Sequence, residues 1–439
     1  MTMVNGFTAA DAERLPASER ELVARRERAL GPAYRLFYER PLHIVRGDGV
    51  WLYDAEGKRY LDAYNNVASV GHCNPHVVKA ICDQAHVLNT HTRYIHEGIL
   101  DYAEKLLATF PAELNHVMFT CTGSEANDLA LRIARQYTGG TGVIVTQLAY
   151  HGITEQVAAT SPSLGAGVPL GQCVRTVRAP DAYRLGAENV SRIFAEDVRR
   201  AIDDMRSAGI KPAALLFDGI FASDGVLSDP AGFAKEAVEL AQSEGLLYIA
   251  DEVQSGFGRT GSSMWGFQRH GVKPDIVTMG KPMGNGQPIA AAVMRTEVVE
   301  EFGRTARYFN TFGGNPVSCA AGNAVLEVIE NEGLLENCAN VGAYLKAGIA
   351  ELALRYPVIG DVRGSGLFIG VELVTDRASK SPAAKATTQV VNGLRNRGVL
   401  ISSAGPMENI LKVRPQLIFQ REHADLFIET LEHVLRELP

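Results

Sequence analysis

Short apolar runs alternate with helix-like patterns between about residues 100 and 300. This alternation is typical of a mostly parallel sheet that is covered by helices. Residues 124–137 repeat apolar side chains at helical spacing, and we expect Ser124 to cap the start of that helix. The predicted strands are HVMFT (116–120), GVIVT (142–146), AALLFD (213–218), LLYIADEV (246–253), DIVTMG (275–280) and IAAAVM (289–294).

The pattern changes after about residue 325. A long helical pattern with a break at Gly333 is followed by two strand patterns and by an amphipathic helix from about residue 421. Near the other end, GVWLYDAEGKRYLD (49–62) predicts a hairpin that turns at Glu56-Gly57 and joins the C-terminal part. We therefore expect an α/β protein whose N-terminal segment (1–75) joins a small α+β domain (326–439), with a large domain (76–325) between them.

Composition excludes some partners. The formal net charge is −7 and basic residues are scattered, so there is no electrostatic footprint for nucleic acid or an anionic membrane. No apolar run approaches the ~20 residues that span a bilayer. The six cysteines show no CxxC spacing, and the first 30 residues lack the apolar core of a secretory signal. We expect a soluble, cytoplasmic enzyme with reduced thiols.

The stretch TMGKPMGNG (278–286) places one lysine directly after an apolar strand pattern. A lysine is costly to bury unless its amine is paired or chemically altered, so Lys281 requires an explanation. Asp251 ends the preceding strand, and the carboxyl ends of parallel strands face the ligand crevice. Alone, Asp251 reads as a helix cap or a surface carboxylate, and Glu252 is interpreted in that way. Together, Lys281 and Asp251 predict pyridoxal 5'-phosphate (PLP), which condenses with a lysine and pairs its ring nitrogen with a carboxylate.

Neighbouring residues complete the predicted cofactor pocket. CTGSEAND (121–128) offers a glycine, a hydroxyl and a helix N-terminus, which suit a phosphate; alone it would be a plain strand-to-helix turn. Tyr150 in AYHG (149–152) is positioned to stack on the ring, although a core tyrosine has the same signature. Gln254 is positioned to donate to the phenolic oxygen of the ring, and Val253 to press on its face.

GFGRTG (256–261) matches the dinucleotide pattern G-x-G-x-x-G. No amphipathic helix follows it, and the carboxylates of Asp251 and Glu252 would repel a pyrophosphate. We interpret it as a glycine-rich surface turn.

Histidine pairs are the other candidates for a ligand site. His72 and His76 cannot share a helix face because Pro75 interrupts it, and His91 and His96 lack any supporting HExxH or CxxC motif. We expect no metal.

The segments TGSEAND, AYHG, IADEVQSGFGRTG, MGKPMGNG and YFNTFGGNPVSC, in this order, resemble the class III PLP-dependent aminotransferases of fold type I. The resemblance extends from about residue 30 to the end. It implies that Lys281 is the Schiff-base lysine, Asp251 the partner of the pyridinium nitrogen and Gln254 the contact to the phenolic oxygen. It also implies a homodimer with composite active sites, and the remaining implied cofactor-binding residues are Gly123, Ser124, Tyr150, His151, Val253 and, from the other subunit, Thr311.

The same resemblance implies that Arg414, in KVRPQL, holds the substrate carboxylate. The chain departs from the usual pattern at Asp218, where a Glu-Pro pair is common, and at Gln416, where a second proline is common. It is most similar to the branch of alanine–glyoxylate aminotransferase 2-like proteins and ethanolamine-phosphate phospholyases. The implied activity moves an amino group from an amine or amino acid to a keto acid. The alternative is a phospholyase acting on an amino alcohol phosphate, for which Arg93 is a second anion-binding candidate; a non-catalytic scaffold is disfavoured because Lys281 and Asp251 are both present.

Overall fold

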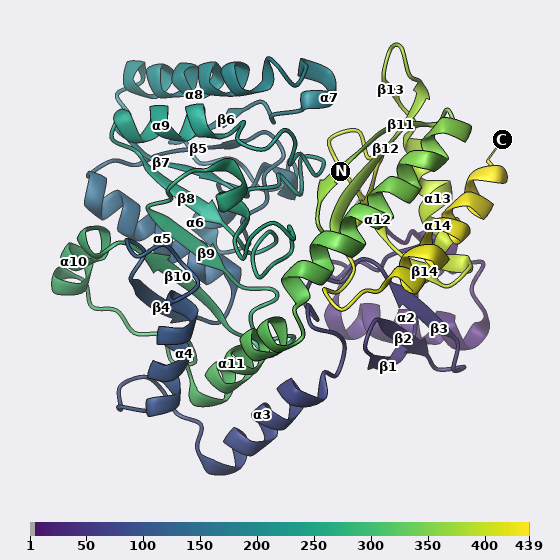
Figure 1. The fold of residues 1–439 in the computed structure, drawn as a ribbon, viewed down its shortest axis with the longest axis horizontal. Helices are drawn as coiled ribbons and strands as arrows, with labels where there is room; N and C mark the ends of the chain where they lie inside the picture. Colours follow the sequence, from purple (N-terminus) through teal and green to yellow (C-terminus); the bar gives the residue numbers. More distant parts are fainter. Residues whose placement is uncertain (1–4, 439) are drawn as a thin grey trace.

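A seven-stranded sheet lies at the centre of the larger body in Figure 1, in the order β4-β10-β9-β8-β7-β5-β6. The structure is a computed structural model that describes residues 5–438. Only β10 runs antiparallel to its neighbours, so the expected α/β architecture is confirmed. The sheet contains one strand that the sequence did not predict, β6. The strands are β4 His116–Thr120, β5 Gly142–Thr146, β6 Val174–Val177, β7 Pro212–Phe217, β8 Leu247–Asp251, β9 Ile276–Met279 and β10 Ala290–Met294.

Helices cover both faces of this sheet. In β7, Leu215 and Phe217 belong to the core that contains α8 (Val190–Ser207) and α9 (Lys235–Ser243), whereas Leu216 belongs to the core beneath α5 (Gly123–Thr138) and α10 (Thr296–Thr305). Alternate residues of a strand point to opposite faces, which is why strands buried on both sides read as continuous apolar runs. In β8, Ile249 faces α5, and Asp251, two residues further on, has the same orientation.

The start of α5 corrects one prediction. Its cap is Thr122 rather than Ser124, because the Thr122 side chain accepts a hydrogen bond from the backbone N–H of Glu125 at 3.1 Å. Ser124 lies inside the first turn, where its Oγ accepts the backbone N–H of Ile153 at 3.1 Å. This contact ties the start of the helix to the loop that follows β5.

The N-terminal elements α2 (Ala17–Leu30) and β1–β3 and the C-terminal elements α12–α14 (residues 334–436) lie at the right of Figure 1. The predicted hairpin is formed by β2 and β3, and β3 pairs in parallel with β14. One sheet has the order β1-β2-β3-β14 and another β11-β12-β16-β15, with β13 paired to β12. The domain boundaries at 75 and 325 stay predictions, and residues 1–4 of the first segment lie outside the described part. These strands are β1 Ile44–Asp48, β2 Trp51–Asp54, β3 Arg59–Asp62, β11 Ile359–Ser365, β12 Phe368–Asp376, β13 Ser381–Pro382, β14 Val399–Leu400, β15 Ser402–Ala404 and β16 Ile410–Val413.

The expected helix break is present at Gly333, whose φ of 60° lies in the left-handed region that glycine tolerates.

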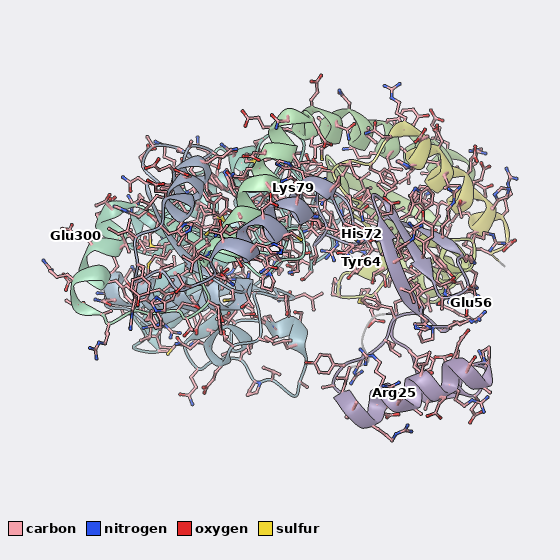
Figure 2. The ribbon with its side chains drawn as sticks, turned by 90° about the horizontal axis from the view of Figure 1, so that it is seen from below. Arg25, Glu56, Tyr64, His72, Lys79 and Glu300 are labelled. Atoms are coloured by element: carbon pink, nitrogen blue, oxygen red, sulfur yellow. The ribbon has the colours of Figure 1, made fainter. Side chains whose placement is uncertain are left out.

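In the view of Figure 2, α2 with Arg25 projects away from the rest of the molecule. Among residues 5–438, no helix combines the length and apolar character needed to cross a membrane. The remaining helices are α1 Ala9–Ala12, α2 Ala17–Leu30, α3 Pro75–Val87, α4 Glu97–Leu107, α6 Glu155–Ala158, α7 Ala182–Leu185, α11 Pro316–Asn331, α12 Leu334–Arg355, α13 Ala384–Asn396 and α14 Arg421–Arg436.

The GFGRTG segment is buried, so the prediction of a surface turn is wrong. Arg259 is 1% exposed and donates hydrogen bonds to the backbone oxygens of Leu367 and Pro415. The C-terminal part of the chain therefore covers this turn.

Glu252 is also fully buried, which corrects the prediction that it is a helix cap or a surface carboxylate. It accepts the backbone N–H groups of Gly266 and Phe267 at 2.7 Å, at the start of a short 3₁₀ helix.

Candidate active site

A small cavity of about 90 Å³ lies beyond the carboxyl ends of β5, β7, β8 and β9. Its walls include every residue of the same chain that was predicted to bind the cofactor. The lining residues are Gly123, Ser124, Tyr150, His151, Gly152, Asp218, Asp251, Val253, Gln254 and Lys281. Segments far apart in sequence thus converge at one edge of the sheet, where ligands of α/β proteins bind.

Asp251 is held by a buried network. It is 4% exposed, and its Oδ2 accepts hydrogen bonds from Nδ1 of His151 at 2.7 Å and Nδ2 of Asn127 at 3.0 Å. Asn127 lies on α5 and accepts the hydroxyl of Thr278 at 2.6 Å. The network fixes the carboxylate through side chains from three elements. Sequence reasoning assigned no role to Asn127 or Thr278, although Asn127 stands in the quoted TGSEAND segment.

Lys281 has no carboxylate within ion-pair distance among the described residues. Its amine lies 6.0 Å from the ring centre of Tyr150, and part of its side chain is open to the cavity. Burial lowers the pKa of Lys281 to about 8, and the charge of Arg414 acts in the same direction, whereas Asp251 and Asp218 oppose the change. Near neutral pH this amine is therefore much closer to its nucleophilic form than an exposed lysine.

The other end of the cavity is formed by the first turn of α5 and the loop after β5. A Cβ on Gly123 would lie 2.9 Å from Val253, and a Cβ on Gly152, at φ 143°, would lie 2.4 Å from Oγ of Ser124. Both glycines therefore permit close approach of main chain at the N-terminus of a 16-residue helix, which favours an anion.

These residues fit PLP. An unpaired lysine amine suits the aldehyde, a fixed carboxylate suits the ring nitrogen, and the start of α5 suits the phosphate. The Nε2 atom of His151 is buried without a partner among residues 5–438, which leaves polar capacity for a bound group beside Asp251. In the bound enzyme, Lys281, Asp251, Gly123 and Ser124 would hold the cofactor.

A second cavity of about 430 Å³ shares Lys281 with the first and is lined by Arg414. Arg414 is 7% exposed, donates a hydrogen bond to Oε1 of Gln254 and stacks its guanidinium 4.4 Å from the ring centre of Tyr64. The described residues offer it no carboxylate partner. Its positive charge is therefore available to an anionic substrate group.

Asp218, at the position where the chain departs from the family pattern, is not paired with Arg414. Its carboxylate accepts the backbone N–H groups of Ile220 and Ala222 at 3.0 Å. Burial raises the pKa of Asp218, and the nearby charge of Asp251 raises it further. Asp218 shapes the turn after β7 at the wall of the cofactor cavity.

Two predicted residues lie outside both cavities. Thr311 is exposed, and the guanidinium of Arg93 lies 3.8 Å from the ring centre of Phe309. The structure therefore brings Arg93 close to the segment that contains Thr311, and neither residue lines one of the two cavities that contain Lys281.

Three of the four candidate metal ligands contact other side chains. His72 contacts Asp62 and His76 contacts Glu327, each at 2.7 Å, and His91 stacks on Tyr94. The part of the chain that is described contains no group of three or more His, Cys, Asp or Glu side chains placed to bind a metal.

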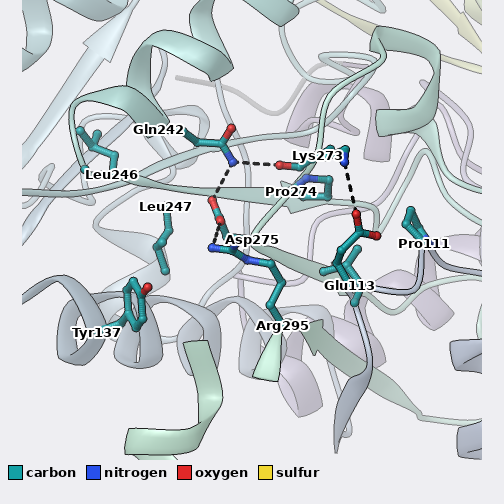
Figure 3. Close-up of a pocket in the computed structure, with 12 residues that line it drawn as sticks. Pro111, Glu113, Tyr137, Gln242, Leu246, Leu247, Lys273, Pro274, Asp275 and Arg295 are labelled. Atoms are coloured by element: carbon teal, nitrogen blue, oxygen red, sulfur yellow. Dashed lines mark hydrogen bonds and ion pairs between the residues drawn. The ribbon is translucent and has the colours of Figure 1, made fainter. Parts of the chain in front are cut away.

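A larger cavity of about 520 Å³ lies at the opposite edge of the sheet (Figure 3). Its charged side chains are paired with each other: Asp275 with Arg295, and Glu113 with Lys273 at 3.2 Å. Because it contains no unpaired nucleophile and is remote from Lys281, the smaller cavity is the better candidate for chemistry.

Residues 37–435 match the family model for class III aminotransferases. An alanine–glyoxylate aminotransferase 2-like protein of Drosophila melanogaster is 40% identical over 437 residues, which cover 96% of this chain and 88% of that protein. The chain belongs to the class III aminotransferase family.

Solved structures agree with this assignment. A phospholyase from Arthrobacter in complex with phosphoethanolamine is 47% identical, with a TM-score of 0.92, and the match covers 95% of this chain and 100% of that one. A PLP-bound amine transaminase from an uncultivated Pseudomonas species is 30% identical, with a TM-score of 0.83, covering 91% and 96%. This class III aminotransferase is a PLP-dependent enzyme of fold type I, as the sequence predicted.

Proposed function

We propose that this class III aminotransferase moves an amino group from an amine or amino acid to a keto acid in two half-reactions, with Lys281 as the residue that attaches PLP. The observation that carries the proposal is the position of Lys281, which opens both into the cavity of Asp251 and into the cavity of Arg414. One side suits the cofactor ring and the other suits a substrate with an anionic group.

The roles of the side chains follow from their surroundings. When bound, PLP withdraws electrons from the carbon that carries the amino group. Asp251 favours a proton on the ring nitrogen by direct charge pairing, and His151 and Asn127 keep its carboxylate in place. Lys281 would hold the cofactor, and its amine would take up the proton from the substrate carbon that carries the amino group. Arg414 orients the substrate through its anionic group.

The proposal is tested by product analysis. Purified enzyme loaded with PLP is given an amine and pyruvate in one assay and ethanolamine phosphate in another. Formation of alanine without release of phosphate supports the transaminase. Release of phosphate without any alanine would overturn it.

A phospholyase is the second candidate, because the 47%-identical Arthrobacter structure is described as a phospholyase with phosphoethanolamine. Both activities begin with loss of the proton next to the amine, and they differ in whether a β-phosphate then leaves. An arginine without a carboxylate partner binds phosphate as readily as carboxylate, so Arg414 suits either substrate. For a phospholyase, Arg93 is a further candidate to bind the substrate phosphate. Because it lines neither cavity that contains Lys281, it would have to act from the second subunit of a dimer.

Replacing Arg414 by lysine should raise KM for pyruvate by about tenfold or more, because a lysine cannot form the bidentate, charge-assisted contact to a carboxylate. KM for a donor amine without a carboxylate should stay close to wild type. Steady-state kinetics with both substrates provide the measurement, and Arg192→Lys on the exposed face of α8 is the matched control. Equal losses for both substrates would rule out the carboxylate role.

We also propose a homodimer in which Thr311 completes the cofactor site of the partner. Support comes from exposed apolar side chains near this segment, with Ile95 95% and Phe312 69% exposed. Neighbouring apolar side chains that are this exposed are typical of a protein–protein contact, and a two-fold interface would cover them.

Mixing two inactive variants tests the shared site. Lys281→Ala and Thr311→Glu should each be inactive alone, whereas refolded mixtures should regain up to about a quarter of wild-type activity, because each mixed dimer contains one intact site. No recovery, although light scattering shows mixed dimers, would place Thr311 outside the partner's site.

A further inference from the structure

The direction of the Arg414 side chain is set by few bonds of its own. Its only side-chain hydrogen bond among the described residues goes to Gln254, and its Nε has no partner. A buried guanidinium without a carboxylate is oriented by the groups packed against it.

Tyr64 supplies the main packing surface. The guanidinium carbon of Arg414 lies 4.4 Å from the ring centre of Tyr64 and 5.9 Å from the ring centre of Phe368, which is the only other aromatic ring near it among the described residues. Cations bind to aromatic faces in this distance range. The ring of Tyr64 is itself packed edge-on against Phe37, with 5.7 Å between centres. The position of Tyr64 thus determines where Arg414 can point.

Asp62 fixes the turn that carries Tyr64. Its Oδ1 accepts the backbone N–H groups of Tyr64 at 3.1 Å and Asn65 at 3.0 Å. Its Oδ2 accepts Nε2 of Gln416 at 3.1 Å and contacts Nε2 of His72 at 2.7 Å. Asp62 is 2% exposed and Gln416 is fully buried, so these bonds are shielded from water. Figure 2 shows Tyr64 and His72 close to one another near the junction of the two bodies.

Gln416 closes a loop of contacts around Arg414. It stands two residues after Arg414, and the backbone N–H of Arg414 donates to the oxygen of Ala63 at 2.8 Å. Residues 62–64 and 414–416 are therefore joined by a main-chain bond, by the Gln416–Asp62 bond and by the Tyr64–Arg414 stack. Movement of the guanidinium would break the stack while the other two contacts hold the backbone.

We propose that Tyr64, Asp62 and Gln416 are positioning residues that hold Arg414 in one orientation toward the cavity it shares with Lys281, and so favour the binding of substrates with a small anionic group near the reacting carbon over substrates without one. The proposal rests on the substrate-binding role of Arg414. It adds that the preference for an anionic group depends on how firmly these three residues hold the arginine.

The test uses the holoenzyme and three variants. Tyr64→Leu removes the ring, Tyr64→Phe keeps it, and Gln416→Met keeps the size but removes the donor to Asp62. Two quantities are measured: the Kd of propionate, an unreactive carboxylate, by calorimetry, and KM for pyruvate and for a carboxylate-free amine.

Tyr64→Leu should weaken propionate and pyruvate by about tenfold, Gln416→Met by about threefold, and Tyr64→Phe by less than twofold, with kcat nearly unchanged in each. The carboxylate-free amine should bind as in wild type. Unchanged propionate binding in Tyr64→Leu, or equal losses for substrates with and without a carboxylate, would overturn the proposal. Propionate binding is measured without turnover, so it decides this point even if the wild-type enzyme forms no alanine and the proposed function fails.

Discussion

Replacing Lys281 by alanine should abolish turnover, with a fall in rate of at least ~10³-fold. Its amine is unpaired among the described residues. Burial lowers the pKa of this amine to about 8, so the amine is neutral and nucleophilic at a lower pH than that of an exposed lysine. The alanine variant loses both the covalent attachment of the cofactor and the group that moves the substrate's proton. PLP should still bind non-covalently, because Asp251 and the start of α5 are unchanged.

The measurement is alanine formation together with the visible absorbance of the loaded enzyme. Lys273→Ala is the matched control, since this lysine lies at the opposite edge of the sheet with its side chain 83% exposed. It should behave as wild type in both assays. If Lys281→Ala kept most of its transamination rate, Lys281 would have no place in the mechanism.

The central strands were predictable because each is buried on both faces and leaves a short, uninterrupted apolar run. GVIVT matches the fully buried strand β5 to the residue, and HVMFT matches the edge strand β4, which is buried only in part. The strand β6 escaped notice because Arg175 and Thr176 interrupt its apolar pattern, and both are only partly buried. A continuous apolar run thus indicates a strand that is buried on both faces, whereas a strand that contains partly exposed polar residues has no such run.

Apart from Arg93 and Thr311, the site residues that sequence reasoning identified lie at the ends of strands or in the loops and the helix start that follow them, where local pattern and fold rules meet. The residues that hold these side chains in place do not lie next to them in the sequence, so no local pattern identifies them. Asn127 reaches Asp251 across 124 positions of the sequence, and the two are neighbours only because α5 crosses the end of β8. Likewise GFGRTG reads locally as an exposed turn, yet a Cβ on Gly366 would lie 2.5 Å from the backbone of Thr260, so a distant segment buries it.

Replacing Asp251 by asparagine should slow removal of the substrate's proton by orders of magnitude while the protein still folds. The near-isosteric amide fills the same space at the end of β8, but it carries no charge to keep a proton on the ring nitrogen. Some stability should be lost, about 1–3 kcal/mol, because an amide Nδ2 in place of an oxygen would face the donor groups of His151 and Asn127.

The decisive quantity in this variant is the exchange rate of the substrate's α-deuterium, because it reports proton removal separately from product release. Asp251→Asn should show slow exchange and a low kcat with KM changed little, since Arg414 still holds the substrate. Asp197→Asn serves as the control: Asp197 is also buried, at 7% exposure, but lies on α8 and pairs with Arg178. If both variants exchanged deuterium at the wild-type rate, the negative charge of Asp251 would have no part in proton removal.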